Sequence, residues 1–352
     1  MTRLIRVLVV DDSAFVRKIV TQMLSRSPFI EVVGSARDGG EALEMCERLR
    51  PDVVTLDLVM PGIDGLEFLR RQMATHPIPV VVCSISHESG AAALEAFELG
   101  AVEFVQKPTA LATDRVFEIA EELLAKVKAA AAVNMPARGP DETTAPVAAP
   151  RAKAGAAPPV VAGQTDIVVI GISTGGPQAL RHVIPRFAAD FPVPIAVVLH
   201  MPVGYTEMYA QRLNDISGLD VVEAHDGDLI RPGAMFLAPA GRHLAFARAG
   251  DGAVHAHLDL RPFDTPHRPA VDVLFRSAAE VYGSRVLGVV MTGMGTDGLV
   301  GAAHIKAKGG RILTEAESSC VVYGMPRAVV EACLSDRVAT LNDMASSIME
   351  MV

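Results

Sequence analysis

The sequence predicts an α/β protein built from two doubly wound parallel-sheet domains. Short runs of β-branched and aliphatic residues alternate with segments of helical period in both halves of the chain. Between them lies a proline- and alanine-rich stretch with almost no large apolar residues, which cannot bury enough surface to form a core. We therefore predict a first domain over 1–128, an Ala/Pro-rich linker over 129–165, whose first alanines can extend the preceding helix, and a second domain over 166–352.

Five short apolar runs define the first domain, and segments of helical period separate them. Strands that alternate with helices in this way form a parallel sheet covered on both faces. The five predicted strands are RVLVV, EVVGS, DVVTL, PVVVCS and AVEFVQ.

The second domain begins in the same way but has a different middle. Three runs predict buried parallel strands, DIVVIG, PIAVVLH and SRVLGVVMTG. The segment over about 219–262 is rich in turn residues and in short alternating runs, so we expect antiparallel strands there.

Composition narrows the classes of function. The 352 residues are 50% hydrophobic and 21% charged, with a net charge of −9, which argues against a large nucleic-acid-binding face. No apolar run is long enough to cross a bilayer and the N-terminus lacks a signal-peptide pattern, so we expect a cytoplasmic protein without membrane insertion. The four cysteines have no metal-type spacing, which indicates structural thiols. Because the net charge disfavours nucleic acid, we expect the partner of this chain to be another protein.

Unusual polar residues follow the strands of the first domain. Asp11 and Asp12 end the first strand, Asp57 the third, Ser84 the fourth and Lys107 the fifth. Ligands gather at this edge of a parallel sheet, and converging carboxylates suit Mg²⁺. A hydroxyl, a lysine and a cation around Asp57 would stabilise phosphoryl oxygens if this aspartate were a nucleophile. Taken singly, each acid could instead cap the helix that follows it, as Asp12 could.

The ordered elements DD, LDLVMPGIDG, S and KP span this domain, which resembles the response-regulator receiver family. The resemblance implies a flavodoxin-like fold and phosphorylation of Asp57 by a sensor histidine kinase. It also implies Mg²⁺ held by the Asp12 and Asp57 side chains and the Val59 carbonyl, with Asp11 acting largely through water. Val59 departs from the acid or asparagine often found there, which bears on the lifetime of the phosphorylated state.

The same resemblance implies a switch. Ser84 and Phe104 would form the switch pair that responds to phosphorylation, with Lys107 opposite the acids.

A glycine-rich turn, GISTGGPQ, follows the first strand of the second domain. It has no lysine after its glycines, as a P-loop requires, and Ser173 stands where a dinucleotide turn needs glycine. Gly171, Ser173 and Gly175 do satisfy the G-x-S-x-G spacing of a nucleophilic serine. A serine between strand and helix is also a common N-cap, and the turn alone leaves that alternative open.

Two further residues at strand ends favour the nucleophile. His200 ends the PIAVVL strand, and Asp297 follows the VLGVV strand. If these strands neighbour that of Ser173, a serine, an imidazole and a carboxylate meet in one crevice. His200 would then take the serine proton, and Asp297 would orient the imidazole.

Five motifs in order strengthen this reading, and with them the second domain resembles the catalytic domain of the CheB family of chemotaxis protein-glutamate methylesterases. They are GISTGGPQALRHV, LHMPVGYTEMYAQRL, HRPAVDVLF, MTGMGTDG and AESSCVVYGMPRAVVE. The resemblance implies a Rossmann-like domain with an antiparallel β insertion. It places the triad on Ser173, His200 and Asp297, and the oxyanion hole on the Met294 backbone N–H with Thr174 as a second contributor.

The combined resemblance implies a phosphorylation-activated hydrolase. It would demethylate glutamate γ-methyl esters on the cytoplasmic domain of a methyl-accepting chemoreceptor, release methanol and deamidate receptor glutamines, with no cofactor in the esterase site. A DNA-binding regulator and a catalytically inactive scaffold are the alternatives. The net negative charge weighs against a DNA-binding regulator. The intact set of Ser173, His200 and Asp297 weighs against an inactive scaffold. His255 and His257 could pair as metal ligands, but no third ligand lies nearby in the sequence.

Overall fold

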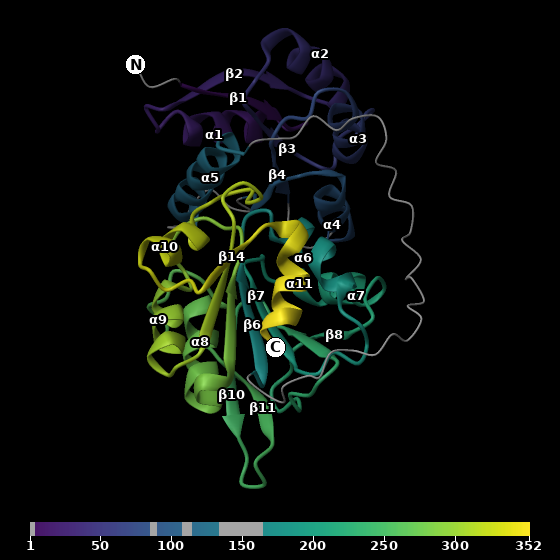
Figure 1. Ribbon diagram of the computed structural model, residues 1–352. Helices are drawn as coiled ribbons and strands as arrows, with labels where there is room; N and C mark the ends of the chain where they lie inside the picture. The colour runs from purple at the N-terminus through teal and green to yellow at the C-terminus, as the bar shows by residue number, and fades with distance from the viewer. Residues whose placement is uncertain (1–3, 85–89, 108–114, 134–164) are drawn as a thin grey trace.

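The computed structural model of the chain describes residues 4–84, 90–107, 115–133 and 165–352 (Figure 1). Most of the predicted linker lies outside these ranges, as do residues 85–89 after Ser84. Helix α5 ends at Ala131, so the first alanines after 128 do continue the helix.

The first domain contains a parallel five-stranded sheet in the order β2-β1-β3-β4-β5. Its strands are β1 (Ile5–Val10), β2 (Ile30–Ala36), β3 (Val53–Leu56), β4 (Val80–Ser84) and β5 (Glu103–Gln106). Side chains alternate between the two faces of a strand, so each strand contributes to the apolar cores on both faces of the sheet. Val7 and Val9 pack with α1 (Ala14–Leu24) and α5 (Arg115–Ala131). Leu8 and Val10 pack on the opposite side, with α2 (Gly39–Leu49), α3 (Gly65–Thr75) and α4 (Gly90–Leu99).

The second domain contains a seven-stranded sheet in the order β14-β13-β12-β6-β7-β9-β8, in which every pairing is parallel. Its strands are β6 (Ile167–Ile172), β7 (Ile195–Leu199), β8 (Asp220–Glu223), β9 (Ala234–Leu237), β12 (Val286–Val290), β13 (Arg311–Glu315) and β14 (Arg337–Ala339). The fully buried central strands β6, β7 and β12 explain the continuous apolar runs in the sequence.

Helices cover both faces of this sheet. Val168 and Ile170 of β6 pack toward α6 (Gly176–Val183), α7 (Thr206–Asn214) and α11 (Leu341–Met351). Ile167 and Val169 pack on the other face, where α8 (Val271–Tyr282), α9 (Leu299–Ala307) and α10 (Met325–Glu331) lie. Short 3₁₀ turns η1 (Ile184–Arg186) and η2 (Gly283–Arg285) lead toward β7 and β12. None of the helices in the described ranges is long and apolar enough to span a membrane.

The expectation of antiparallel strands over 219–262 is correct only for its second half. β10 (His243–Arg248) and β11 (Val254–Asp259) form an antiparallel hairpin, which projects from the end of the molecule opposite the first domain (Figure 1). β8 and β9 instead join the main sheet as parallel strands. Both are four residues long, and such short strands carry no pattern that distinguishes parallel from antiparallel pairing.

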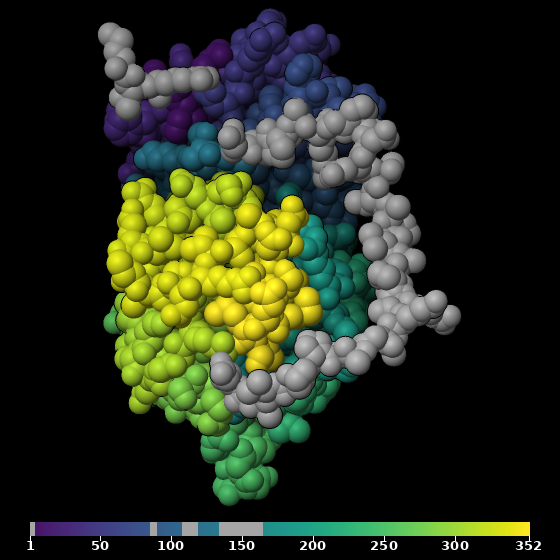
Figure 2. All heavy atoms as spheres, in the orientation of Figure 1, coloured from purple at the N-terminus to yellow at the C-terminus, as the bar shows by residue number. Residues whose placement is uncertain are grey.

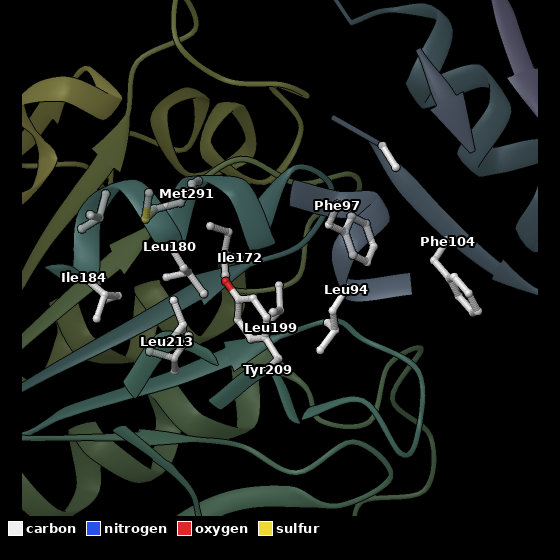
Figure 3. Close-up of a cluster of buried hydrophobic side chains, with 14 of the residues drawn as sticks. Leu94, Phe97, Phe104, Ile172, Leu180, Ile184, Leu199, Tyr209, Leu213 and Met291 are labelled. Atoms are coloured by element: carbon white, nitrogen blue, oxygen red, sulfur yellow. The ribbon is translucent and has the colours of Figure 1, made fainter. Parts of the chain in front are cut away.

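The two domains contact one another directly, and the first covers one end of the second (Figure 2). One buried apolar cluster runs through both, with Leu94, Phe97 and Phe104 from the first domain near Ile172, Leu199 and Tyr209 from the second (Figure 3).

Polar contacts surround this cluster. Glu98 Oε1 of α4 lies 2.7 Å from a guanidinium nitrogen of both Arg181 and Arg212. The Gln178 amide donates to the Phe97 carbonyl at 3.0 Å. Apolar burial and charge pairing therefore both hold the domains together.

The α8 helix provides a test of the second core. Phe275 is fully buried between α8, α9 and β12. Phe275→Ala should lower the free energy of unfolding of the second domain by about 3–5 kcal/mol, because it removes apolar contacts and leaves a cavity. Denaturant titration followed by circular dichroism measures the change. Val300→Ala, at a residue 48% exposed, is the control and should cost less than about 0.5 kcal/mol; equal losses would contradict the assigned packing.

Candidate active site

The predicted acids of the first domain lie together at the carboxyl ends of the strands. Lys107 Nζ is 2.6 Å from both Asp11 Oδ2 and Asp57 Oδ2, and all three residues are buried. Burial raises the pKa of Asp11 despite the nearby ammonium. Burial also acts to lower the pKa of Lys107, but its two carboxylate partners outweigh this and raise it. The lysine therefore stays charged.

Asp12 completes a cluster that could hold a cation. One ligand oxygen from each of Asp11, Asp12 and Asp57 lies within 4.8 Å of the others, and Asp12 is exposed. The donor set is all oxygen and opens to solvent on one side, which fits Mg²⁺ with retained waters. The N-cap of α1 is Ser13, so Asp12 does not cap that helix. Val59 is 68% exposed beside Asp57.

The predicted switch residues are both buried. Ser84 ends β4, and Phe104 lies in the neighbouring strand β5. The Phe104 ring faces Tyr205 of the second domain, with ring centroids 5.1 Å apart. Phe104 thus lies in the contact between the two domains.

Ser173 leaves β6 in the turn before α6. Its backbone N–H donates to the Thr292 carbonyl at 3.0 Å. The N-cap of α6 is Gly175, with φ of 77°, a conformation that favours glycine. The N-cap interpretation of Ser173 is therefore wrong. Gly293 passes so close that a Cβ there would lie 2.9 Å from the Ser173 Cβ.

His200 and Asp297 meet as predicted, because β12, β6 and β7 are neighbours in the sheet. His200 Nε2 lies 2.8 Å from Asp297 Oδ2. The same carboxylate accepts the backbone N–H groups of Val271 at 2.8 Å and Asp272 at 2.9 Å. Burial alone would raise the pKa of Asp297, but these hydrogen bonds outweigh it and lower the pKa. The buried Nδ1 of His200 has no hydrogen-bond partner among the described residues.

Two residues of the HRPAVDVLF motif support this pair, although sequence reasoning gave them no definite role. His267 stacks on His200, with centroids 4.1 Å apart and planes inclined by 27°. Burial and the adjacent imidazole lower the pKa of His267 to about 4, so it is neutral near pH 7. Asp272 Oδ1 accepts the N–H groups of Gly298 at 3.0 Å and Gly301 at 2.6 Å. It thereby fixes the loop that follows Asp297.

A buried polar network ties the turn of Ser173 to the loop of Met294. The Thr292 hydroxyl donates to the Thr174 carbonyl at 2.9 Å, and the Thr292 N–H donates to Glu315 at 2.9 Å. Glu315 is fully buried, which raises its pKa. Thr292 lies in the MTGMGTDG motif, but its role and that of Glu315 were not predicted, because the Thr174 carbonyl and the Thr292 N–H come near their partners only in the fold.

Four of the site residues predicted in the second domain line one cavity of about 620 Å³. Ser173, Thr174, His200 and Met294 come from the second domain. The opposite wall comes from β5 and α5 of the first domain, through Glu103, Gln106, Glu121, Glu122, Ala125 and Lys126. Both domains therefore bound the space around the serine.

Three other histidines, His243, His255 and His257, have structural partners. Buried His243 accepts the Ala270 N–H at 3.2 Å. His255 contacts the Gly227 carbonyl, and His257 pairs with Asp226. Within the described ranges, a group able to hold a metal ion is found at the Asp11 cluster and not at this histidine pair.

Comparison with known proteins agrees with this arrangement. The family described as CheB methylesterase matches residues 168–348, and the response regulator receiver domain matches residues 7–117. The chain belongs to the CheB methylesterase family. A relative from Myxococcus xanthus named protein-glutamate methylesterase/protein-glutamine glutaminase 5 is 52% identical over 346 residues, 97% of this chain and 96% of the relative.

Further relatives cover the same extent. A protein-glutamate methylesterase/protein-glutamine glutaminase of Geobacillus kaustophilus is 43% identical over 350 residues, with 99% of each chain covered. The crystal structure of the Thermotoga maritima CheB methylesterase catalytic domain superposes with a TM-score of 0.52 at 42% identity. It covers 53% of this chain and 99% of that one. The CheB family thus accounts for both parallel-sheet domains.

The lowered pKa of Asp297 predicts how stability depends on pH. Above an unfolded-state pKa of about 3.9, the ionised carboxylate stabilises the fold, and this contribution is lost as pH falls through the lower folded-state pKa. Asp297→Asn should therefore cost about 1–3 kcal/mol at pH 7, with the difference from wild type shrinking toward pH 3. Denaturant unfolding across this range measures it. Asp251→Asn, in an exposed turn, serves as control; a difference that grows with acidity would contradict the assignment.

Proposed function

We propose that this CheB-family chain hydrolyses glutamate γ-methyl esters, and deamidates glutamines, on the cytoplasmic domain of a methyl-accepting chemoreceptor. The observation that carries the proposal is that His200, paired with Asp297, lines one cavity with Ser173. The names of the full-length relatives support this substrate class. Pairing of an oriented imidazole with a serine at strand ends is the arrangement of nucleophilic hydrolases.

In the proposed reaction, the Ser173 hydroxyl attacks the γ-carbonyl carbon while His200 takes its proton. Asp297 holds the imidazole and stabilises its charged form. The Met294 backbone N–H, with Thr174 as second contributor, stabilises the oxyanion. His200 then protonates the leaving methoxide, and methanol departs. A water molecule attacks the acyl carbon while His200 takes its proton, and His200 returns that proton to the Ser173 oxygen as the bond to the glutamate carboxyl group breaks. With a glutamine substrate, ammonia leaves in place of methanol.

The first domain would control this reaction through Asp57. We propose that a sensor histidine kinase supplies the phosphoryl group to Asp57. Mg²⁺, when bound by the Asp11, Asp12 and Asp57 group and the Val59 carbonyl, would offset negative charge on the phosphoryl oxygens. Lys107 already pairs with Asp57 and offers a second positive charge.

Regulation would act through the wall that the receiver contributes to the cavity. Phosphorylation would change the positions of Ser84 and Phe104, and with them the contact between Phe104 and Tyr205. A weaker interdomain contact would open the cavity to the receptor. The receiver therefore restrains the esterase until Asp57 is modified.

Ser173→Ala tests the nucleophile. Alanine fits the turn but cannot form the acyl-enzyme, so methanol release from methylated receptor membranes should fall by at least about a thousandfold. A circular dichroism spectrum like that of wild type checks folding. Turnover within threefold of wild type would remove Ser173 from the mechanism.

Asp57→Ala and deletion of residues 1–128 test the regulation. The deletion should raise methanol release in the absence of phosphodonor, because the cavity loses its receiver wall. Asp57→Ala in the full chain should abolish the stimulation of methanol release by a small phosphodonor with Mg²⁺. Chelation of Mg²⁺ should abolish this stimulation in the wild-type protein. If the full chain and the 166–352 fragment show equal unstimulated rates, the receiver does not occlude the site.

A further inference from the structure

One side chain of the receiver reaches the catalytic turn itself. Glu103, the first residue of β5, accepts a hydrogen bond at Oε1 from the hydroxyl of Thr174, the residue after Ser173. Both residues are more than nine-tenths buried, and both line the cavity that contains Ser173 and His200. The receiver thus presents a glutamate carboxylate to the turn that bears the nucleophile.

A lysine of the receiver holds this carboxylate in place. Lys126 Nζ of α5 lies 3.3 Å from Glu103 Oε2 and donates to the Phe104 carbonyl at 2.6 Å. Burial acts to lower the pKa of Lys126, but Glu103 and Glu122 outweigh it and raise the pKa. A buried carboxylate is costly unless it is paired and hydrogen-bonded, and Glu103 has both kinds of partner.

The turn that bears Thr174 is fixed through its backbone. The Thr174 carbonyl accepts the Thr292 hydroxyl at 2.9 Å, which fixes the turn independently of the side chain. The Thr174 hydroxyl faces the receiver across the cavity and is a donor for an oxygen of a ligand there. In the present arrangement that oxygen belongs to Glu103.

We propose that the Thr174 hydroxyl is a binding position for the γ-carboxyl group of a glutamate side chain, and that Glu103 occupies it as an internal analogue of the reaction product. The inference rests on the proposed function, since hydrolysis of a glutamate ester yields the same side chain. Inhibition by the receiver is then specific occupation of a substrate position, beyond general covering of the cavity.

The path from Asp57 to this carboxylate is short. Lys107, which pairs with Asp57, directly follows β5, and Glu103 begins the same four-residue strand. A displacement of β5 on phosphorylation would therefore move Glu103 away from Thr174.

Other interdomain contacts act outside the cavity. Glu98 pairs with Arg181 and Arg212, and none of these three residues lines the space around Ser173. They hold the domains together without competing for a substrate position. A tethered competitor, by contrast, raises the apparent KM and leaves kcat at saturation unchanged.

Glu103→Ala in the full chain tests the occupation of Thr174. Without phosphodonor, the KM for methylated receptor membranes should fall at least about threefold, with kcat changed less than twofold. Glu121→Ala is the matched control, because Glu121 lines the same cavity but is exposed and pairs with Arg26 inside the receiver. Its KM should stay within about 1.5-fold of wild type. An unchanged KM for Glu103→Ala, or an equal fall for Glu121→Ala, would overturn the proposal.

Thr174→Val tests the hydroxyl while keeping the side-chain shape. In the phosphodonor-treated chain it should raise KM several-fold and also lower kcat, because Thr174 is the proposed second oxyanion contributor. Adding Glu103→Ala to it should give no further fall in unstimulated KM. A wild-type KM for Thr174→Val would show that the hydroxyl does not bind substrate and would also overturn the proposal. If phosphodonor-treated wild type released no methanol, the proposed function itself would fail. If wild type released methanol but Glu103→Ala left KM unchanged, only the proposal that Glu103 is an internal product analogue would be rejected.

Discussion

The second domain depends on the fixed position of one carboxylate. Asp297 accepts hydrogen bonds from the Val271 and Asp272 backbone N–H groups and also from His200, so both its oxygens are committed. A buried carboxylate with fewer partners would be protonated or would reorient. Because these donors come from the start of α8, the packing of that helix against the sheet decides where the imidazole lies.

The strand order supplies the remaining constraint. β12, β6 and β7 are adjacent and parallel, so the loops that leave their carboxyl ends share one edge of the sheet. Buried hydrogen bonds then fix the loops relative to each other, as Thr292 does for the turn of Ser173. In the proposed reaction, rigid placement of Ser173 and His200 lowers the entropic part of the barrier.

The receiver meets this site through both apolar and polar contacts. An apolar cluster around Phe97 and Phe104 is combined with partly exposed ion pairs such as Glu98–Arg181. Exposed ion pairs contribute little individually, so under the proposed regulation a change of a few kcal/mol at Asp57 would be enough to shift the balance between closed and open arrangements. The proposed regulation requires an interface that can separate reversibly.

The sequence by itself determined the two parallel-sheet domains, the acid cluster of Asp11, Asp12 and Asp57, and Ser173, His200 and Asp297 as site candidates. Apolar runs and polar residues at strand ends are local patterns, so they can be recognised in the sequence alone. Only the tertiary structure decided that β8 and β9 lie parallel in the main sheet, that Ser173 is not a cap, and that Asp272 and Thr292 support the site. It alone placed Glu103 against Thr174, 71 residues away in the chain. These features arise from contacts between backbone groups and side chains distant in sequence, and no local pattern encodes such contacts.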